Sequence, residues 1–360
     1  MVKYISPIKI QSVETEEEEK ETDFWQFLQS GEDIAGDKSE TLSILLSGMR
    51  GHGKTLFVFL WVKHTLARIY ELIHGTHIKQ DIAQEHPDLL NRMEEAAQHI
   101  CFCILDVDAE GTEKQIKRLD LLPVCLRSQV HRMMAVSYTS VISAKNILIE
   151  VIKEHTEKHP EYPFGRFLLV EGGGKVWKGC RNYWTWKTDS EAVNEVDLRM
   201  KRMKKQRRSG GKFQMLYDQG QRDEYAGMND LLINLLDEFK LSSVEYRFNF
   251  IYTVLLKEHI LNYGKPNQEI IITEQGRPKL IAPYFDVVAR METRNIQENV
   301  GTERKPVMKE KPHWFMTTHP DVGKNRTASW FEFDWTNKGA GEIFAYMKEL
   351  EETSPFFEIW

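Results

Sequence analysis

The sequence predicts an α/β fold in which a doubly wound, mostly parallel sheet is flanked by helices. Two observations predict it. Short apolar runs suited to strands alternate along the chain with longer segments of helical periodicity. The first strand-to-helix junction carries a glycine-rich turn, at residues 48–55. The chain has 360 residues, of which 41% are hydrophobic and 28% charged, which is the composition of a globular protein.

Each expected element has its own pattern. The first strand, 42–47, is short, apolar and β-compatible, and the segment after the turn, 56–70, has apolar residues at helical spacing. Later apolar runs that end near turn residues predict further strands. These strands are expected at 100–105, 167–170 and 248–256, with apolar stretches at 133–136 and 314–318 and helices at 113–119, 143–158 and 229–239.

Composition also divides the chain. Residues 1–40 hold eleven Asp or Glu and four Lys, a charge of −7, so the rest of the chain carries +1 of the net −6. This pattern predicts a mobile acidic extension. Its apolar segment 23–28 either folds back onto its own domain or docks on a neighbouring subunit. We expect the main α/β domain at 41–340, with insertions near 71–99 and 172–215, and a C-terminal helix or tail at 341–360.

Residues 48–55 fit the phosphate-binding pattern G-x-x-x-x-G-K-[ST]. Its glycines let the backbone curl until successive N–H groups point at a phosphate, beside the positive end of the next helix. Lys54 is then placed on the β- and γ-phosphates, and Thr55 offers a hydroxyl to Mg²⁺. The alternative is a glycine turn followed by an ordinary lysine. The predicted site for ATP and Mg²⁺ comprises Gly48, Met49, Arg50, Gly51, His52, Gly53, Lys54, Thr55 and Leu56.

Hydrolysis of ATP also needs an acid near Mg²⁺, a carboxylate that polarises water, and positive charge at the γ-phosphate. Two strand ends offer an acid. Glu171 follows the apolar run 167–170, which is the pattern of a Walker B strand with Glu where Asp is usual. Asp106, which ends another apolar run, is the rival for the same role.

Residues 108–111, Asp-Ala-Glu-Gly, make the chain resemble the RecA-like ATPases, in particular a phage-encoded branch related to recombination and single-strand-annealing proteins. In that family, the strand after the P-loop helix ends in an Asp-x-Glu-type motif whose Glu activates water, and the Walker B strand comes later. The resemblance implies that Glu110 is the general base and Glu171 the acid beside Mg²⁺, with Asp106 as the fallback.

Three further positions resemble this family. Residues 324–326 resemble the Lys-x-Arg element that RecA-like proteins insert into a neighbour's ATP site. This implies catalytic roles in trans for Lys324 and Arg326, and self-association into a ring or filament; a solvated basic turn is the alternative. Segment 281–290 resembles the lead into a late core strand. His259 matches the position of a γ-phosphate sensor, or is a surface histidine.

A strongly basic segment follows the Walker B candidate, where RecA-like proteins carry a DNA-contacting loop. Cationic side chains neutralise backbone phosphates, although the same spacing suits a solvated basic helix. The aromatic residues Trp177, Tyr183, Trp184 and Trp186 lie upstream, either as a stacking platform for bases or as core. We predict contact with nucleic acid, single-stranded DNA in the first instance, through Arg199, Lys201, Arg202, Lys204, Lys205, Arg207, Arg208 and Lys212.

Together these patterns predict a Mg²⁺-dependent ATPase that acts on nucleic acid in phage-type recombination, annealing or replication. A genome-packaging or helicase-type motor shares the motifs, and a nucleotide-dependent switch that binds a protein partner is the alternative from another class. With no apolar run of membrane-spanning length and no secretory signal, we expect a cytoplasmic protein without a membrane partner. Core thiols, rather than disulfides or a zinc site, are expected at Cys101, Cys103, Cys125 and Cys180.

Overall fold

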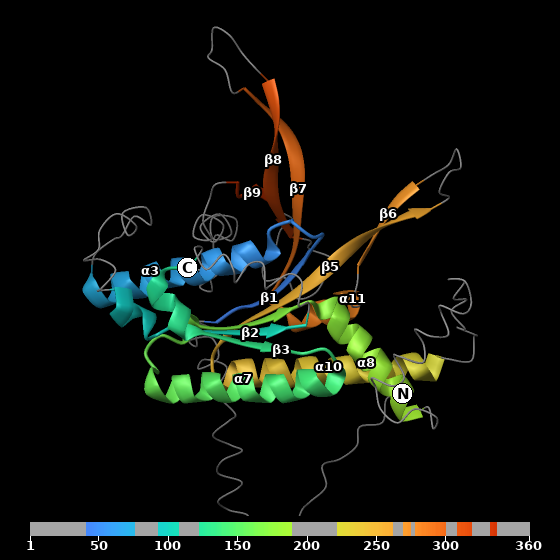
Figure 1. Cartoon of the computed structure of the whole chain (residues 1–360), viewed down its shortest axis with the longest axis horizontal. Helices are drawn as coiled ribbons and strands as arrows, with labels where there is room; N and C mark the ends of the chain where they lie inside the picture. The colour runs from blue at the N-terminus through green and yellow to red at the C-terminus, as the bar shows by residue number, and fades with distance from the viewer. Residues whose placement is uncertain are drawn as a thin grey trace, which may run out of the picture. The chain divides into compact units, whose positions relative to one another are not determined.

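The computed structural model describes residues 41–75, 93–107, 122–188, 222–261, 269–274, 278–299, 308–318 and 332–336. Their strands are β1 Ser43–Gly48, β2 Cys101–Asp106, β3 Val130–Met134, β4 Arg166–Glu171, β5 Asn249–Leu261, β6 Glu269–Glu274, β7 Val287–Asn299, β8 Met308–Thr318 and β9 Glu332–Asp334. They form one nine-stranded sheet in the order β3-β2-β4-β5-β1-β7-β8-β9, with β6 paired to β5 (Figure 1).

The strands from β3 to β7 along this order run parallel, and β6, β8 and β9 are antiparallel to their neighbours. The predicted doubly wound, mostly parallel sheet is therefore confirmed. Because parallel strands end at the same edge, the C-terminal ends of β1, β2 and β4 lie along one edge of the sheet. Ligands of such sheets bind at this edge.

Helices cover both faces of the sheet. The principal ones are α3 Lys54–His74, α7 Tyr138–Lys158, α8 Gly173–Thr188 and α10 Arg222–Glu245. Figure 1 shows α3 on one face and α7, α8 and α10 on the other. Neighbouring side chains of β1 enter different cores: Ile44 and Leu46 join the core under α3, and Leu45 joins the core on the α7 and α10 side. Burial on both faces explains why the central strands read as continuous apolar runs.

The predicted helices are shorter than the observed ones. α7 begins at Tyr138 rather than at residue 143, because Ser137 caps it: the Ser137 hydroxyl accepts from the Ser140 N–H at 3.2 Å and the Ser140 hydroxyl accepts from the Ser137 N–H at 2.9 Å. Of the apolar stretch expected at 133–136, only Met133 and Met134 lie in a strand, β3, which ends at Met134 just before this cap.

Several expectations lie outside the described residues. These are the acidic extension 1–40, the helix at 113–119, much of both insertions, and the tail 341–360, so the domain boundaries stay predictions. Within the described ranges, no helix has both the length and the apolar character needed to cross a bilayer. Cys101, Cys103 and Cys180 are free, buried thiols, as predicted, and Cys125 is free and half-buried.

The aromatic residues upstream of the basic segment are packing residues in α8. Trp177 packs against the core on the α10 side. The Tyr183 ring lies 4.8 Å from the Tyr138 ring of α7. A Cβ added to Gly227 of α10 would lie 2.3 Å from the Trp184 ring. These three side chains therefore pack against the core or a neighbouring helix, as the core interpretation expects; the side chain of Trp186 lies outside the described residues.

Candidate nucleotide-binding site

The glycine-rich loop joins β1 to α3 at the C-terminal edge of the sheet. Gly51 and Gly53 both have a φ of 83°, a left-handed conformation that costs glycine little. Gly53 is the N-cap of the 21-residue α3, where no side chain caps the helix and no acid lies in the first turn. The first N–H groups of a helix have no intrahelical acceptor and carry partial positive charge. The loop is therefore suited to bind an anion such as phosphate.

Later parts of the chain hold this loop. A Cβ on Gly48 would lie 2.5 Å from the carbonyl oxygen of Met291 in β7, and one on Gly53 would lie 2.7 Å from the Trp335 ring. The His52 Nδ1 lies 3.0 Å from the same Met291 oxygen. Glycine is therefore required at positions 48 and 53 by close contact, in addition to backbone conformation.

The Lys54 side chain lies inside the turn. Its Nζ donates to the carbonyl oxygens of Gly48 at 2.7 Å and Met49 at 2.9 Å, and the residue is only 8% exposed. A buried ammonium is costly unless it is hydrogen-bonded or paired with an anion. The loop thus fixes a positive charge at the first turn of α3, where the motif requires it.

Glu171 ends β4, which is separated from β1 by β5 alone. Burial raises the pKa of its carboxyl to about 7, against the opposing effects of the Lys54 charge and of hydrogen bonding by Thr253 and Thr55. The Thr253 hydroxyl, on β5, also accepts from the Gly172 N–H at 3.1 Å, which fixes the end of β4. The fold therefore brings Lys54, Thr55 and Glu171 together across one strand.

Asp106, the rival acid, lies beside Glu171 in the β2–β4 ladder. Its side chain is fully buried and paired with Arg132 of β3, whose Nε donates to Oδ2 at 3.2 Å. The negative charge of Asp106 also raises the pKa of Glu171. The two acids thus have different surroundings: Asp106 is held by an arginine, whereas Glu171 interacts with the lysine and threonine of the P-loop.

The residues at this edge fit Mg²⁺. Two buried carboxylate oxygens, Glu171 Oε2 and Asp106 Oδ1, have no hydrogen-bond partner among the described residues. Such an oxygen is costly to bury unless a donor or a cation satisfies it. Mg²⁺ binds through one or two carboxylates together with waters and phosphate oxygens. Thr55 and Glu171 would hold the ion, which supplies positive charge to the phosphate oxygens.

The raised pKa of Glu171 predicts a pH-dependent stability. Between the ordinary carboxyl value of 4.5 and about 7, the folded state holds a proton that the unfolded state has lost. The free energy of unfolding therefore falls as pH rises through this interval, because the ionised carboxylate is left in a buried site. We expect Glu171→Gln to be stabilised relative to the wild-type protein as pH rises from 4.5 to about 7, as measured by urea titrations without nucleotide or Mg²⁺.

The matched control is Glu157→Gln, which removes an exposed carboxyl from α7. It should leave the pH dependence of the wild-type protein unchanged. Parallel pH profiles for Glu171→Gln and the wild-type protein would contradict the raised pKa.

Sequence patterns missed three residues of this edge. Thr253 lies within an apolar strand and has no motif, so only its pairing position reveals it. Arg132 lies on β3, whose partner Asp106 is known only once the strands are paired. Trp335 is more than 280 positions from Gly53 in the sequence, and no local signal links them.

Other predicted site residues lie outside the described part of the chain. The backbone of His259 belongs to β5, but its side chain lies outside as well. The roles of all these residues stay predictions. Besides His259, the residues are Glu110, Lys324, Arg326, Arg199, Lys201, Arg202, Lys204, Lys205, Arg207, Arg208 and Lys212.

No protein-family model and no curated protein matches the sequence. Among solved structures, the chain is similar to a KaiC-like protein from the hyperthermophilic archaeon Pyrococcus horikoshii, with 11% sequence identity and a TM-score of 0.25. The match covers 78% of this chain and 90% of that one. The fold assignment rests on the strand order and the P-loop geometry rather than on this likeness.

Proposed function

We propose that the chain is a RecA-like, Mg²⁺-dependent ATPase that acts on nucleic acid as an oligomer. The observation that carries the proposal is the position of Lys54 and Thr55 beside the buried carboxyl of Glu171. The strand order supports it, since β2 follows the P-loop helix and β4 comes later, and the two strands end side by side. That is the order that the RecA-like resemblance implies for the base and the metal acid.

In this proposal each residue has one task. The N–H groups of the P-loop bind the phosphates, and Lys54 exchanges the Gly48 and Met49 carbonyls for phosphate oxygens. Thr55 and Glu171 position Mg²⁺, and Thr253 orients the Glu171 carboxyl. Glu110 accepts the proton of the attacking water. Lys324 and Arg326 from a neighbouring subunit neutralise charge at the γ-phosphate, as the Lys-x-Arg resemblance implies.

The nucleic-acid task of the proposal rests on the basic segment. Eight cations without an acid between Arg199 and Lys212 contrast with a chain of net charge −6. Such a segment neutralises nucleic-acid phosphates. We propose single-stranded DNA as the first candidate and phage-type recombination, annealing or replication as the role.

We expect single-stranded DNA to stimulate ATP hydrolysis, because in this proposal DNA binding at the basic segment is linked to turnover at the nucleotide site. The apparent affinity should fall steeply with salt, with a slope of about −0.7 per phosphate neutralised. A variant with Lys204, Lys205, Arg207 and Arg208 replaced by glutamine should reduce that slope by up to about 3. The measurement is the ATPase rate against oligonucleotide concentration at several salt concentrations.

The control variant replaces Lys153 and Lys158 of α7 by glutamine, which removes charge from a helix outside the basic segment. It should keep the stimulation of the wild-type protein. An ATPase rate that does not change with DNA, together with no oligonucleotide binding at low salt, would contradict the proposed action on nucleic acid and favour a nucleotide switch. Stimulation by double-stranded DNA alone would favour a packaging motor.

A further inference from the structure

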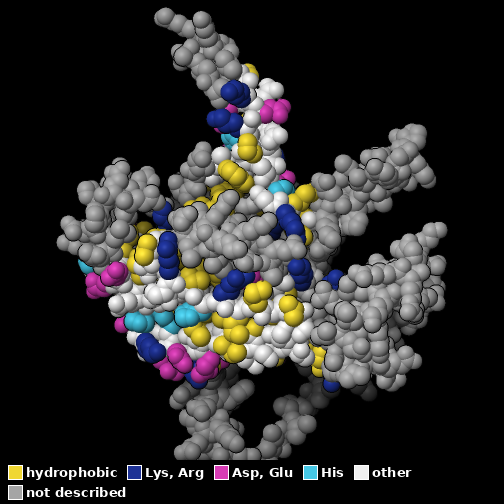
Figure 2. Space-filling view, viewed as in Figure 1, with side chains coloured by type: hydrophobic (Ala, Val, Ile, Leu, Met, Phe, Trp, Pro, Cys, Tyr) yellow, Lys and Arg dark blue, Asp and Glu magenta, His cyan; other side chains and the backbone are white. Residues whose placement is uncertain are grey.

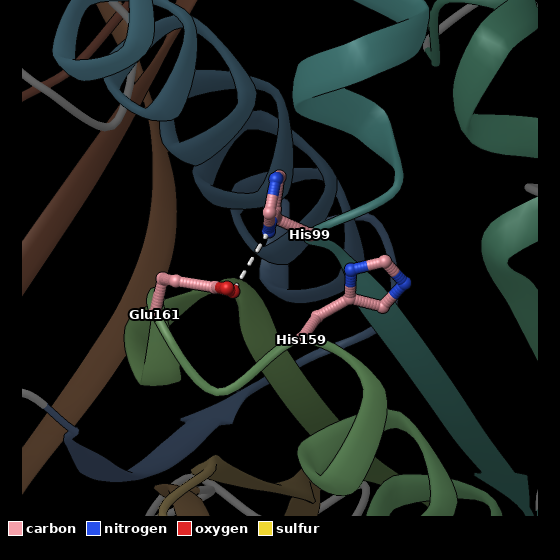
Figure 3. A group of neighbouring side chains, drawn as sticks. All are labelled: His99, His159 and Glu161. Atoms are coloured by element: carbon pink, nitrogen blue, oxygen red, sulfur yellow. Dashed lines mark ion pairs between the residues drawn. The ribbon is translucent and has the colours of Figure 1, made fainter.

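Three side chains suited to metal binding lie together at the N-terminal edge of β2 and β4, the opposite edge from the P-loop. His99 precedes β2, and His159 and Glu161 lie between α7 and β4 (Figure 3). One ligand atom from each lies within 4.8 Å of the others. We propose that these residues form a binding site for a divalent transition-metal ion, Zn²⁺ in the first instance. This site is independent of the proposed ATPase function.

The donor set matches the preference of such ions. Imidazole nitrogen and carboxylate oxygen are both zinc ligands, and imidazole favours transition metals over Mg²⁺ or Ca²⁺. Two histidines and one carboxylate leave a fourth position for water. Two neutral imidazoles with one carboxylate also offset part of the charge of a divalent cation.

The spacing of two of the three ligands already suits a bound ion. The His99 Nδ1 lies 3.5 Å from the Glu161 Oε2. Metal–ligand bonds of about 2.0–2.1 Å in a tetrahedral site separate two ligand atoms by about 3.4 Å. The third ligand atom, on His159, lies within 4.8 Å, so it must approach by at most about 1.4 Å. Figure 3 shows Glu161 on one side of His99 and the His159 ring on the other.

Main-chain contacts fix the frame of the site. The His159 N–H donates to the His155 carbonyl at 2.8 Å, and the His159 carbonyl accepts from Arg166 Nη2 at 2.7 Å. Gly165 lies so close to the His99 carbonyl that a Cβ would come within 2.3 Å of its oxygen. These contacts hold the backbones of both histidines, so rotation of a side chain is enough to complete the site.

The His99 Nδ1 is the atom that most needs a ligand. It is buried and has no hydrogen-bond partner among the described residues, and the Glu161 carboxylate at 3.5 Å is beyond good hydrogen-bonding distance. His155, a neighbouring histidine in the last turn of α7, already has a partner, because its Nε2 lies 3.0 Å from the Gln98 carbonyl oxygen. A bound cation would satisfy both the nitrogen and the carboxylate.

The site is open to solvent on one side. The Glu161 side chain is 57% exposed, whereas the His99 side chain is 18% exposed. Figure 2 shows histidine side chains gathered on the surface over one end of α7. An ion can therefore enter from solvent and reach a buried nitrogen. Once bound, it links the start of β2 to the start of β4, the strand pair whose other ends carry Asp106 and Glu171.

The test titrates the full chain with Zn²⁺ alone, without nucleotide. We expect one ion more per wild-type chain than per His159→Ala or Glu161→Gln chain, and a rise in the wild-type melting temperature that these variants lack. Loss of one ligand should weaken binding by about tenfold or more. The binding of Co²⁺ should give the visible absorption bands of a tetrahedral site, and these bands should disappear in both variants.

His131→Ala is the matched control, because it removes a partly buried histidine from β3 instead. It should bind as the wild-type protein does. Glu161→Gln keeps its size at an exposed position, so its folding is not at risk. Equal stoichiometry in the wild-type protein and both variants, or no Zn²⁺ binding by the wild-type chain, would overturn the proposal, whatever the outcome of the ATPase experiments.

Discussion

Lys54→Ala is expected to lower the kcat of ATP hydrolysis by about 10²–10³-fold and to leave a small residual activity. Lys54 carries a buried positive charge in the P-loop turn. The residue is 8% exposed, and its ammonium group donates to two loop carbonyls. Without it, negative charge that develops on the phosphates loses the cation that the P-loop itself supplies. Nucleotide binding, followed with a fluorescent ATP analogue, should weaken in parallel with turnover.

The same substitution has a second consequence at Glu171. The Lys54 charge lowers the pKa of this carboxyl, so its removal raises that pKa further and leaves less of the ionised form for Mg²⁺. The residual activity of Lys54→Ala should therefore shift to higher pH. Only an effect at the site, and not general loss of structure, produces that shift.

Lys63→Ala provides the control, since Lys63 lies on the same helix and is half-buried. It should retain wild-type turnover and the wild-type circular dichroism spectrum. Wild-type turnover by a folded Lys54→Ala protein would show that residues 48–55 are a glycine turn with an ordinary lysine.

The sequence predicted the central strands and the P-loop because their signals are local. An apolar run that is buried on both faces looks the same in the sequence and in the sheet, as β1 and β4 show. The P-loop is a set of adjacent residues whose backbone conformation follows from its glycines. Both could be found without knowing which strands pair.

Pairings across the sheet could not be predicted in this way. Glu171 and Asp106 look alike in the sequence, since each ends an apolar strand. Only the order of the strands shows that Arg132 is paired with one of them and that the other lies near Thr55. Trp335 packs on Gly53 through antiparallel strands added late in the chain, and a contact of that sequence separation has no local pattern.

These different surroundings give the two acids opposite expected behaviour, which a pair of isosteric substitutions can separate. Glu171→Gln should reduce Mg²⁺-dependent hydrolysis by about 10²–10³-fold, because an amide keeps the shape of the carboxyl but has no charge to hold the ion. Its stability at neutral pH should rise, since a buried carboxylate with an unsatisfied oxygen has been replaced.

Asp106→Asn removes the same charge from the neighbouring strand end, but it leaves Arg132 without its carboxylate. Breaking a buried pair destabilises a protein by about 3 kcal/mol or more, and the 21% exposure of the Arg132 side chain lowers that cost. We expect Asp106→Asn to lower the free energy of unfolding by up to about 3 kcal/mol and to retain more turnover than Glu171→Gln. The measurements are kcat at saturating ATP and Mg²⁺, and urea denaturation. If Asp106→Asn were instead the variant that loses Mg²⁺-dependent turnover, Asp106 would be the metal acid, and Glu171 would serve only to shape its surroundings.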